Sequence, residues 1–124
     1  MEKKEEFGFK ELIVWQKSVE FARKVIKTID KLNTDTKHYR IKEQTEAAAT
    51  SVAANIAEGK GRYSKKEFKQ YLYIARGSIY ETITFLTILS ELEWISLEDL
   101  KTLEKEGLSL NKMLNSLINT LKND

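Results

Sequence analysis

The sequence contains no cysteine and no proline, and it has only five glycines. The absence of cysteine excludes a disulfide framework and a thiolate metal site. The absence of proline favours long, uninterrupted helices, because proline breaks the ladder of helical hydrogen bonds. Long apolar runs are missing as well, so no segment is expected to cross a membrane. The formal net charge is only +2, which gives no strong overall attraction to nucleic acid.

The 124 residues suit a single domain, and a domain of this size buries roughly two-thirds of its unfolded surface. Residues 1–8 are expected to form a flexible lead, and residues 9–124 the domain itself. The charged start is followed by no apolar run of the kind that a signal peptide contains. We therefore expect a cytoplasmic protein.

The segment 47–59 is unusually rich in alanine, with six alanines among thirteen residues. Alanine has the highest helix propensity, and its methyl group lets neighbouring backbones approach closely. Two stripes run along this helix at a spacing of four residues: Ala48, Val52 and Ile56 form one, and Ala49, Ala53 and Ala57 form the other. We expect this segment to be the central packing helix.

Apolar residues recur in steps of three and four along most of the chain, which is typical of amphipathic helices. The predicted helices span 10–32, 37–58, 65–93 and 97–121. Ser64 followed by Glu67 matches a capping box, and Ser96 is a second N-cap. Two glycines, Gly59 and Gly61, permit the chain to leave the second helix with a positive φ.

Four helices with short connections predict an all-α, antiparallel up-down-up-down four-helix bundle. Its core is expected to contain Leu12, Trp15, Val19, Ala22, Ile26 and Ile29 of the first helix, with Val14, Phe21, Val25 and Leu32 widening that stripe. The third helix is expected to add Phe68, Leu72, Ala75, Ile79, Ile83, Leu86 and Leu89, and the fourth Leu97, Leu100, Leu103, Leu110, Leu114, Leu117 and Leu121.

The third helix carries a second apolar seam, which consists of Tyr71, Ile74, Ser78, Phe85, Ile88 and Leu92. This seam either widens the same core or faces a neighbouring subunit. Gly77 lies in the middle of the helix, where glycine costs about 1 kcal/mol relative to alanine. Close approach of another backbone would offset that cost, so Gly77 is assigned a structural role.

Charge is distributed unevenly along the chain, with +4 in residues 58–76 and −5 in residues 77–106. The candidate nucleic-acid site lies in the basic segment and consists of Arg62, Tyr63, Lys65, Lys66 and Lys69. Cations contact phosphates, and an exposed tyrosine can stack on a base. The alternative is a solvated face that serves solubility.

Asn55 and Glu58 are assigned structural roles at the end of the second helix. The Asn55 amide is expected to bond a helix end or a neighbouring helix, with direct ligand contact as the alternative. Glu58 is expected to pair with Arg62 or Lys60, or with a residue of the third helix. Gly59 completes this structural set at the turn.

Sites for catalysis, metals and cofactors are not expected. His38 is the only histidine, and a metal site needs several aligned ligands. The chain contains no phosphate-binding loop, no His-Glu-x-x-His motif and no nucleophile elbow. The sequence therefore predicts neither catalytic residues nor a cofactor, and the protein is not expected to be an enzyme.

Two blocks of sequence carry a resemblance to a known family: Asn-Ile-Ala-Glu-Gly at 55–59 and Tyr-Leu-Tyr-Ile-Ala-Arg-Gly-Ser at 71–78. They resemble bacterial four-helix-bundle proteins encoded in intervening sequences of 23S ribosomal RNA genes. That family is related to the accessory variability determinant of diversity-generating retroelements. The resemblance implies a homopentamer with a central channel, binding to structured RNA and, as in the retroelement relatives, to a reverse transcriptase. It implies no established catalytic activity.

The chain departs from the family pattern at two places. Members often carry a pair of arginines where this chain has Glu46 and Ala47, and Ile-Pro where it has Val52 and Ala53. The first change removes two cations from an RNA-binding face and leaves the bundle prediction intact.

We therefore expect a homo-oligomeric, pentameric bundle that binds structured RNA through the basic turn and the start of the third helix. The alternative is a scaffold that docks another protein, such as a reverse transcriptase, without contacting RNA. Glu46, Ala47 and the acidic segment 77–106 favour this alternative.

Overall fold

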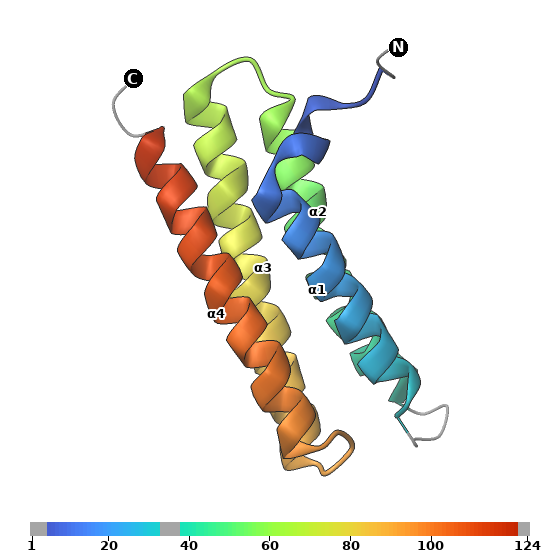
Figure 1. The fold of residues 1–124 in the computed structure, drawn as a ribbon. Coiled ribbons are helices and arrows are strands. Elements are labelled where there is room, and N and C mark those ends of the chain that lie inside the picture. The colour runs from blue at the N-terminus through green and yellow to red at the C-terminus, as the bar shows by residue number, and fades with distance from the viewer. Residues whose placement is uncertain (1–4, 33–37, 122–124) are drawn as a thin grey trace, which may run out of the picture.

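The computed structural model describes residues 5–32 and 38–121, and the described residues form four α-helices and one short 3-10 helix, without strands (Figure 1). The elements are η1 (Gly8–Glu11), α1 (Ile13–Asp30), α2 (Tyr39–Lys60), α3 (Lys65–Glu91) and α4 (Leu97–Thr120). The predicted all-α four-helix bundle is confirmed. Residues 33–36, which separate the first two predicted helices, and the predicted helix start at Lys37 lie outside the described residues.

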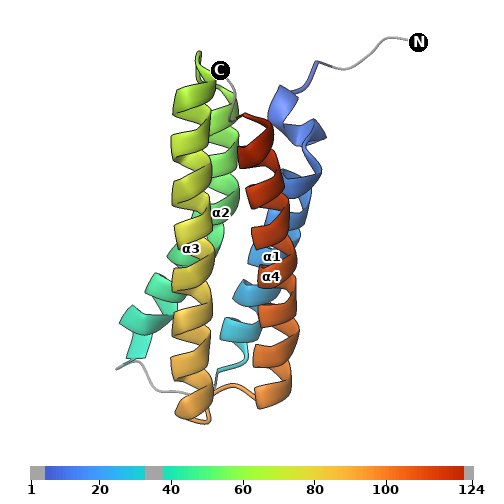
Figure 2. The same cartoon turned by 90° about the vertical axis from the view of Figure 1, so that its left-hand side faces the viewer.

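The four helices surround one core, and each packs against two neighbours. α1 and α3 each contact both α2 and α4, while η1 packs on α1 and α2. Successive helices run in opposite directions, so that α1 and α3 are diagonal in the bundle and point the same way (Figures 1 and 2). The alanine-rich helix that was expected to be central to the packing occupies one corner of the ring, where it packs against α1, α3 and η1.

The starts of the helices depend on local hydrogen bonds. α1 begins at Ile13 and not at the predicted Lys10, because Gly8–Glu11 forms a 3-10 turn and Leu12 is extended. The N-caps predicted for α3 and α4 are confirmed: Ser64 Oγ accepts from the Glu67 N–H at 3.1 Å, and Ser96 Oγ accepts from the Asp99 N–H at 3.0 Å. Such caps satisfy backbone donors that have no partner within the helix.

α3 ends at Glu91, two residues before the predicted end, in a hydrogen-bond pattern that reverses the chain. The Trp94 N–H donates to the Leu89 carbonyl and the Glu93 N–H to the Ser90 carbonyl, both at 2.9 Å. This pair of bonds is the Schellman motif, which requires a left-handed residue just after the helix. Glu93 takes that conformation with φ of 63°, although glycine is the usual residue there.

The core contains most of the predicted apolar residues, with two corrections. Val19 of α1 is 42% exposed and Leu97 of α4 is 57% exposed. The buried residues of α1 are Val14, Phe21, Ala22, Val25 and Ile29, all of them predicted, together with Ser18. The predicted stripe is thus correct except at Val19, and it also contains a buried serine that the apolar pattern did not indicate.

Three hydroxyl residues, Ser18, Thr45 and Thr82, are fully buried in the core. Each donates its hydroxyl to the carbonyl four residues earlier in its own helix, at 2.7 Å. A buried hydroxyl with such a bond avoids the cost of an unsatisfied polar group. Burial of these residues was not predicted, because a polar residue interrupts the hydrophobic pattern.

The exit from α2 does not use a left-handed glycine, so the predicted positive φ is wrong. No described glycine has a positive φ, and Gly61 caps α2 with φ of −78°. Gly59 lies inside α2 and is buried. The glycine at position 59 serves the close packing of α2 against α3, since an added Cβ would meet Tyr71.

Candidate nucleic-acid interface

The turn between α2 and α3 lies at one end of the bundle, together with η1 and the C-terminal end of α4 (Figure 1). Within this turn, the side chain of Tyr63 is completely exposed. An aromatic ring in that position presents both faces to solvent. It can therefore stack on an unpaired base without any rearrangement of the core.

Three lysines of the predicted site follow the turn in the first residues of α3. Lys65 and Lys66 are exposed, and Lys69 is half-buried. The N-terminus of a helix carries a partial positive charge of its own, which adds to the attraction for phosphate. Because Ser64 caps this terminus, the start of α3 is held in a fixed conformation next to Tyr63.

Arg62 was predicted to be part of the RNA-binding site, but in the structure its side chain is bound to other residues of the protein. Its guanidinium donates to Glu58 Oε1 at 2.9 Å and to the Tyr71 hydroxyl at 2.5 Å, and it lies 4.8 Å from the centre of the Tyr71 ring. The interaction with Tyr71, and then that with Glu58, raises the pKa of Arg62 above its ordinary value. Arg62 thus ties the end of α2 to α3.

Two further cations of the basic segment also lie over aromatic rings. Lys60 Nζ is 5.9 Å from the centre of the Phe68 ring, and the Arg76 guanidinium is 4.9 Å from that of Tyr73. Arg76 also donates to Asn115 Oδ1 of α4 at 2.9 Å. The contact with Tyr73 has a sequence signal, because residues three apart on a helix are neighbours. The contacts of Lys60 and Arg76 with other helices have no such signal.

Asn55 joins a polar contact between α2 and α3. Its amide donates to the Ser51 carbonyl and to Ser51 Oγ, both at 2.8 Å. The Ser78 hydroxyl of α3 also donates to Ser51 Oγ, at 2.9 Å. The structure thus places Asn55, like Glu58 and Gly59, in the packing between these two helices.

Metal binding finds no support in the part of the chain that the structure describes, where no group of three or more His, Cys, Asp or Glu residues could hold an ion. The ring of His38 instead lies 4.4 Å from that of Trp94. The described residues also include no helix that is long and apolar enough to cross a bilayer.

Comparison with known families matches residues 10–116 to the family described as 23S rRNA-intervening sequence protein. The chain belongs to this family. The match includes the whole of α1, α2 and α3 and most of α4, so it covers both the bundle and the basic turn. The 23S rRNA-intervening sequence resemblance that the two sequence blocks carried is therefore confirmed.

A solved structure supports the assignment to the 23S rRNA-intervening sequence protein family. A protein of unknown function from the S23 ribosomal protein family of Bacteroides thetaiotaomicron is 30% identical to this chain, with a TM-score of 0.79. The alignment covers 86% of this chain and 98% of that protein. A search among curated proteins gave no match.

Proposed function

We propose that the protein is a non-enzymatic, homo-oligomeric bundle, pentameric in its assembled form, which binds structured RNA. The binding surface is the turn that carries Tyr63 together with Lys65, Lys66 and Lys69 at the start of α3. The observation that carries this proposal is the complete exposure of Tyr63 beside these lysines. An aromatic ring next to a group of cations fits a base and its neighbouring phosphates.

Assembly supplies the affinity that one small patch lacks. In a single chain, three of the six cations in the segment 58–76 are held against aromatic rings. Repetition of the lysine group around an oligomer brings many weak phosphate contacts to one RNA, and linked contacts raise the overall affinity strongly. Exposed apolar residues on α3 support self-association.

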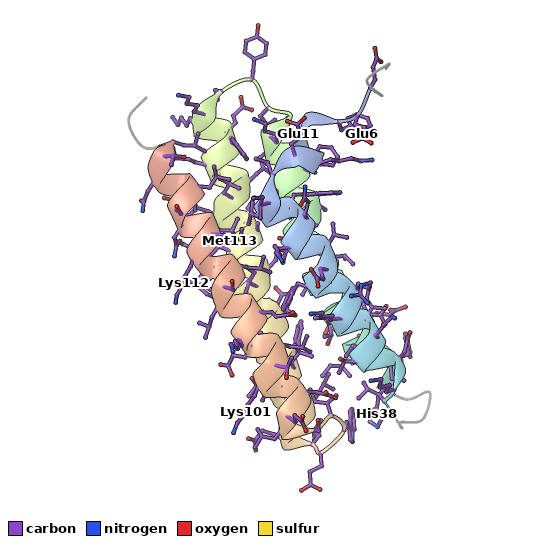
Figure 3. All side chains as sticks on the ribbon, in the orientation of Figure 1. Glu6, Glu11, His38, Lys101, Lys112 and Met113 are labelled. Atoms are coloured by element: carbon purple, nitrogen blue, oxygen red, sulfur yellow. The ribbon has the colours of Figure 1, made fainter. Side chains whose placement is uncertain are left out.

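A charge-reversal pair tests the RNA part of the proposal. The first variant combines Lys65→Glu, Lys66→Glu and Lys69→Glu. The control combines Lys101→Glu, Lys105→Glu and Lys112→Glu on α4, all of which are exposed. Figure 3 shows Lys101 near the opposite end of the bundle and Lys112 along the outer side of α4. The two variants change the net charge equally, so that a difference between them reports position and not total charge.

The measurement is binding to a fluorescent stem-loop RNA over a salt series, with thermal unfolding of each variant as a check on folding. We expect the parent to bind at low salt with a steep salt dependence and the first variant to lose both binding and slope, because phosphate contacts release counterions. The control is expected to bind more weakly but to keep most of the slope. Absence of binding by the parent at low salt, or equal losses in both variants, would contradict the proposal.

Light scattering tests the oligomeric part independently of RNA. We expect a mass close to five times the 14.4 kDa of one chain. A monomer at micromolar concentration would rule this part out, whatever the RNA result.

A scaffold that docks another protein is the second candidate. It is favoured by the exposed apolar residues of α3, among them Ile74 and Tyr80, and by Glu46 and Ala47 where relatives often have arginines. Affinity capture from the native host, with and without ribonuclease, separates the two candidates. A protein partner that stays bound after ribonuclease treatment favours the scaffold, whereas recovery of RNA alone favours the RNA binder.

A further inference from the structure

The outer side of α3 carries exposed apolar side chains and two exposed glutamates. We call this the α3 face, and it consists of Ile74, Gly77, Tyr80, Glu81, Ile88 and Glu91, all exposed. Spacings of three, four and seven residues place them on one arc of the helix. Ile74 is 51% exposed, Tyr80 54% and Ile88 42%. Large apolar side chains that are exposed on one side of a helix are a common feature of interaction sites.

Gly77 lies in the middle of the α3 face with open space around it. A Cβ added to Gly77 would have no neighbouring atom within 4 Å. The packing of this chain therefore does not require a glycine there, unlike at Gly59. A glycine in the interior of a helix costs about 1 kcal/mol relative to alanine, and closer approach of a helix from another molecule compensates for that cost.

The outer side of α1 has the opposite charge. The α1 face consists of Gln16, Val19, Arg23 and Lys27, which are all exposed and share one arc of the helix. Asp30, at the end of α1, is the one exposed carboxylate of this helix. Glu20 is half-buried and pairs with Lys24 at 3.5 Å, so it does not neutralise the arginine and lysine of the α1 face.

The charges of the two faces are not used within the chain. Among the described residues, Arg23, Lys27, Glu81 and Glu91 form no hydrogen bond or ion pair with another side chain. Residues 77–96 contain three glutamates and no lysine or arginine. The α3 face is thus acidic and the α1 face basic, and each has an exposed apolar side chain beside its charges.

The positions of the two helices suit contact between copies. α1 and α3 are diagonal in the bundle and their backbones do not approach closely, since each packs on α2 and α4, so their outer faces point away from each other. Both helices run from the basic-turn end to the opposite end of the bundle (Figures 1 and 2). With a rise of 1.5 Å per residue, Arg23 and Lys27 lie within about 10 Å of the end of α1, and Glu81 and Glu91 within about 15 Å of the end of α3. When two copies lie side by side with their helices parallel, the two cations of α1 and the two carboxylates of α3 are therefore at similar heights along the bundle axis.

We propose that the α1 face of one copy packs against the α3 face of the next, with Arg23 and Lys27 opposite Glu81 and Glu91. This inference rests on the homo-oligomer of the proposed function and assigns its contact surfaces. Because the two faces differ, the contact is head-to-tail, and its repetition closes a ring when the rotation per copy divides a full turn. Complementary charge sets the register, and the apolar residues and Gly77 supply the close contact.

Charge reversal on each face, followed by reversal of both, tests the assignment. One variant carries Arg23→Glu and Lys27→Glu, a second carries Glu81→Lys and Glu91→Lys, and a third carries all four changes. The control carries Lys101→Glu and Lys105→Glu on α4, outside both faces. Assembly is measured by light scattering over a concentration series, and circular dichroism verifies folding.

We expect each two-site variant to dissociate at concentrations at least about tenfold above those of the parent, since like charges then face each other. The four-site variant is expected to assemble again, because its faces are complementary with exchanged signs, and the control to assemble like the parent. Recovery in the four-site variant also excludes misfolding as the cause.

Other outcomes overturn the assignment in distinguishable ways. A monomeric parent rules out the homo-oligomer itself. An oligomeric parent whose two-site variants assemble normally overturns only the proposed faces. Dissociation of only one of the two-site variants overturns the pairing of the two faces, and so does failure of the four-site variant to assemble.

Discussion

Gly59 of α2 and Tyr71 of α3 are so close that a Cβ on residue 59 would lie 2.6 Å from the Cβ of Tyr71. It would also lie 3.0 Å from Cδ1 of Phe68 and 3.3 Å from its carbonyl oxygen. Tyr71 cannot yield at its Cβ without movement of the α3 backbone. The separation of α2 and α3 at this end of the bundle therefore depends on glycine, and the same contact positions Tyr71 beside Arg62 and Glu58.

Substitution of Gly59 by alanine is expected to destabilise the protein. Overpacking of a close contact costs about 1–3 kcal/mol, of which the better helix propensity of alanine recovers up to about 1 kcal/mol. Urea unfolding measures the change. Gly61→Ala is the control, because a Cβ there would be 3.5 Å from its nearest neighbour and φ is already helical. Equal stability of Gly59→Ala and the parent would contradict the role assigned to Gly59.

Substitution of Glu93 by glycine is expected to stabilise the protein by up to about 1 kcal/mol. A residue other than glycine in the left-handed region costs roughly 1–2 kcal/mol, part of which is offset because glycine gains more freedom in the unfolded chain. Glu93→Ala is the control, since it removes the same charge and keeps the Cβ. A stability gain in the alanine variant equal to that of the glycine variant would assign the effect to charge.

Alkaline pH is expected to remove a contribution of Lys24 to stability. Lys24 Nζ donates to Glu106 of α4, and this bond is the main cause that raises the pKa of Lys24 above its ordinary value. Because the pKa of Lys24 is higher in the folded state, its protonated form stabilises the protein. This contribution is fully present below the unfolded pKa of about 10.4 and is lost as pH rises through the folded pKa.

The alkaline effect is measured as urea midpoints from about pH 8 to about pH 12, a range that spans the lysine pKa, for the parent and Lys24→Met. The difference between the two is expected to shrink at the alkaline end. Lys17→Met serves as the control, because Lys17 is an exposed lysine of α1 outside the α1 face and has no ion pair within the described residues. A parent-to-variant difference that stays constant over the whole range would exclude the Lys24–Glu106 bond as its source.

Substitution of Tyr63 by alanine is expected to weaken RNA binding without loss of stability. Stacking of a base on an aromatic residue contributes about 1–3 kcal/mol, and the exposed ring makes no contribution to the core. Tyr39→Ala is a matched control, because Tyr39 is also an exposed tyrosine and lies at the start of α2, at the other end of the bundle. Equal affinity of the two variants for a stem-loop RNA would argue against stacking on Tyr63.

The helices themselves and two of their N-caps could be predicted from the sequence, because both depend on residues close together along the chain. A period of three to four residues marks the buried side of a helix, and Ser64 and Ser96 bond the backbone three residues ahead. Burial of Ser18 could not be predicted in this way, because Ser18 satisfies its hydroxyl within its own helix and so tolerates burial that its polarity argues against.

The basic segment was recognised from its charges, and only the fold shows which of its cations are held against aromatic rings within the protein. Arg62 and Lys60 are close to the lysines in sequence, yet they lie over rings of α3. Such contacts depend on how two helices pack, and neither periodicity nor spacing contains that information.

The sequence by itself determined the number of helices, the N-caps of α3 and α4 and the basic character of the turn, because each follows from interactions within a few residues. Only the tertiary structure decided which cations are held internally, why Gly59 is required, and that the acidic α3 face and the basic α1 face are on different sides of the bundle. The physical reason is that these features depend on distances between helices, which form only when the core is packed.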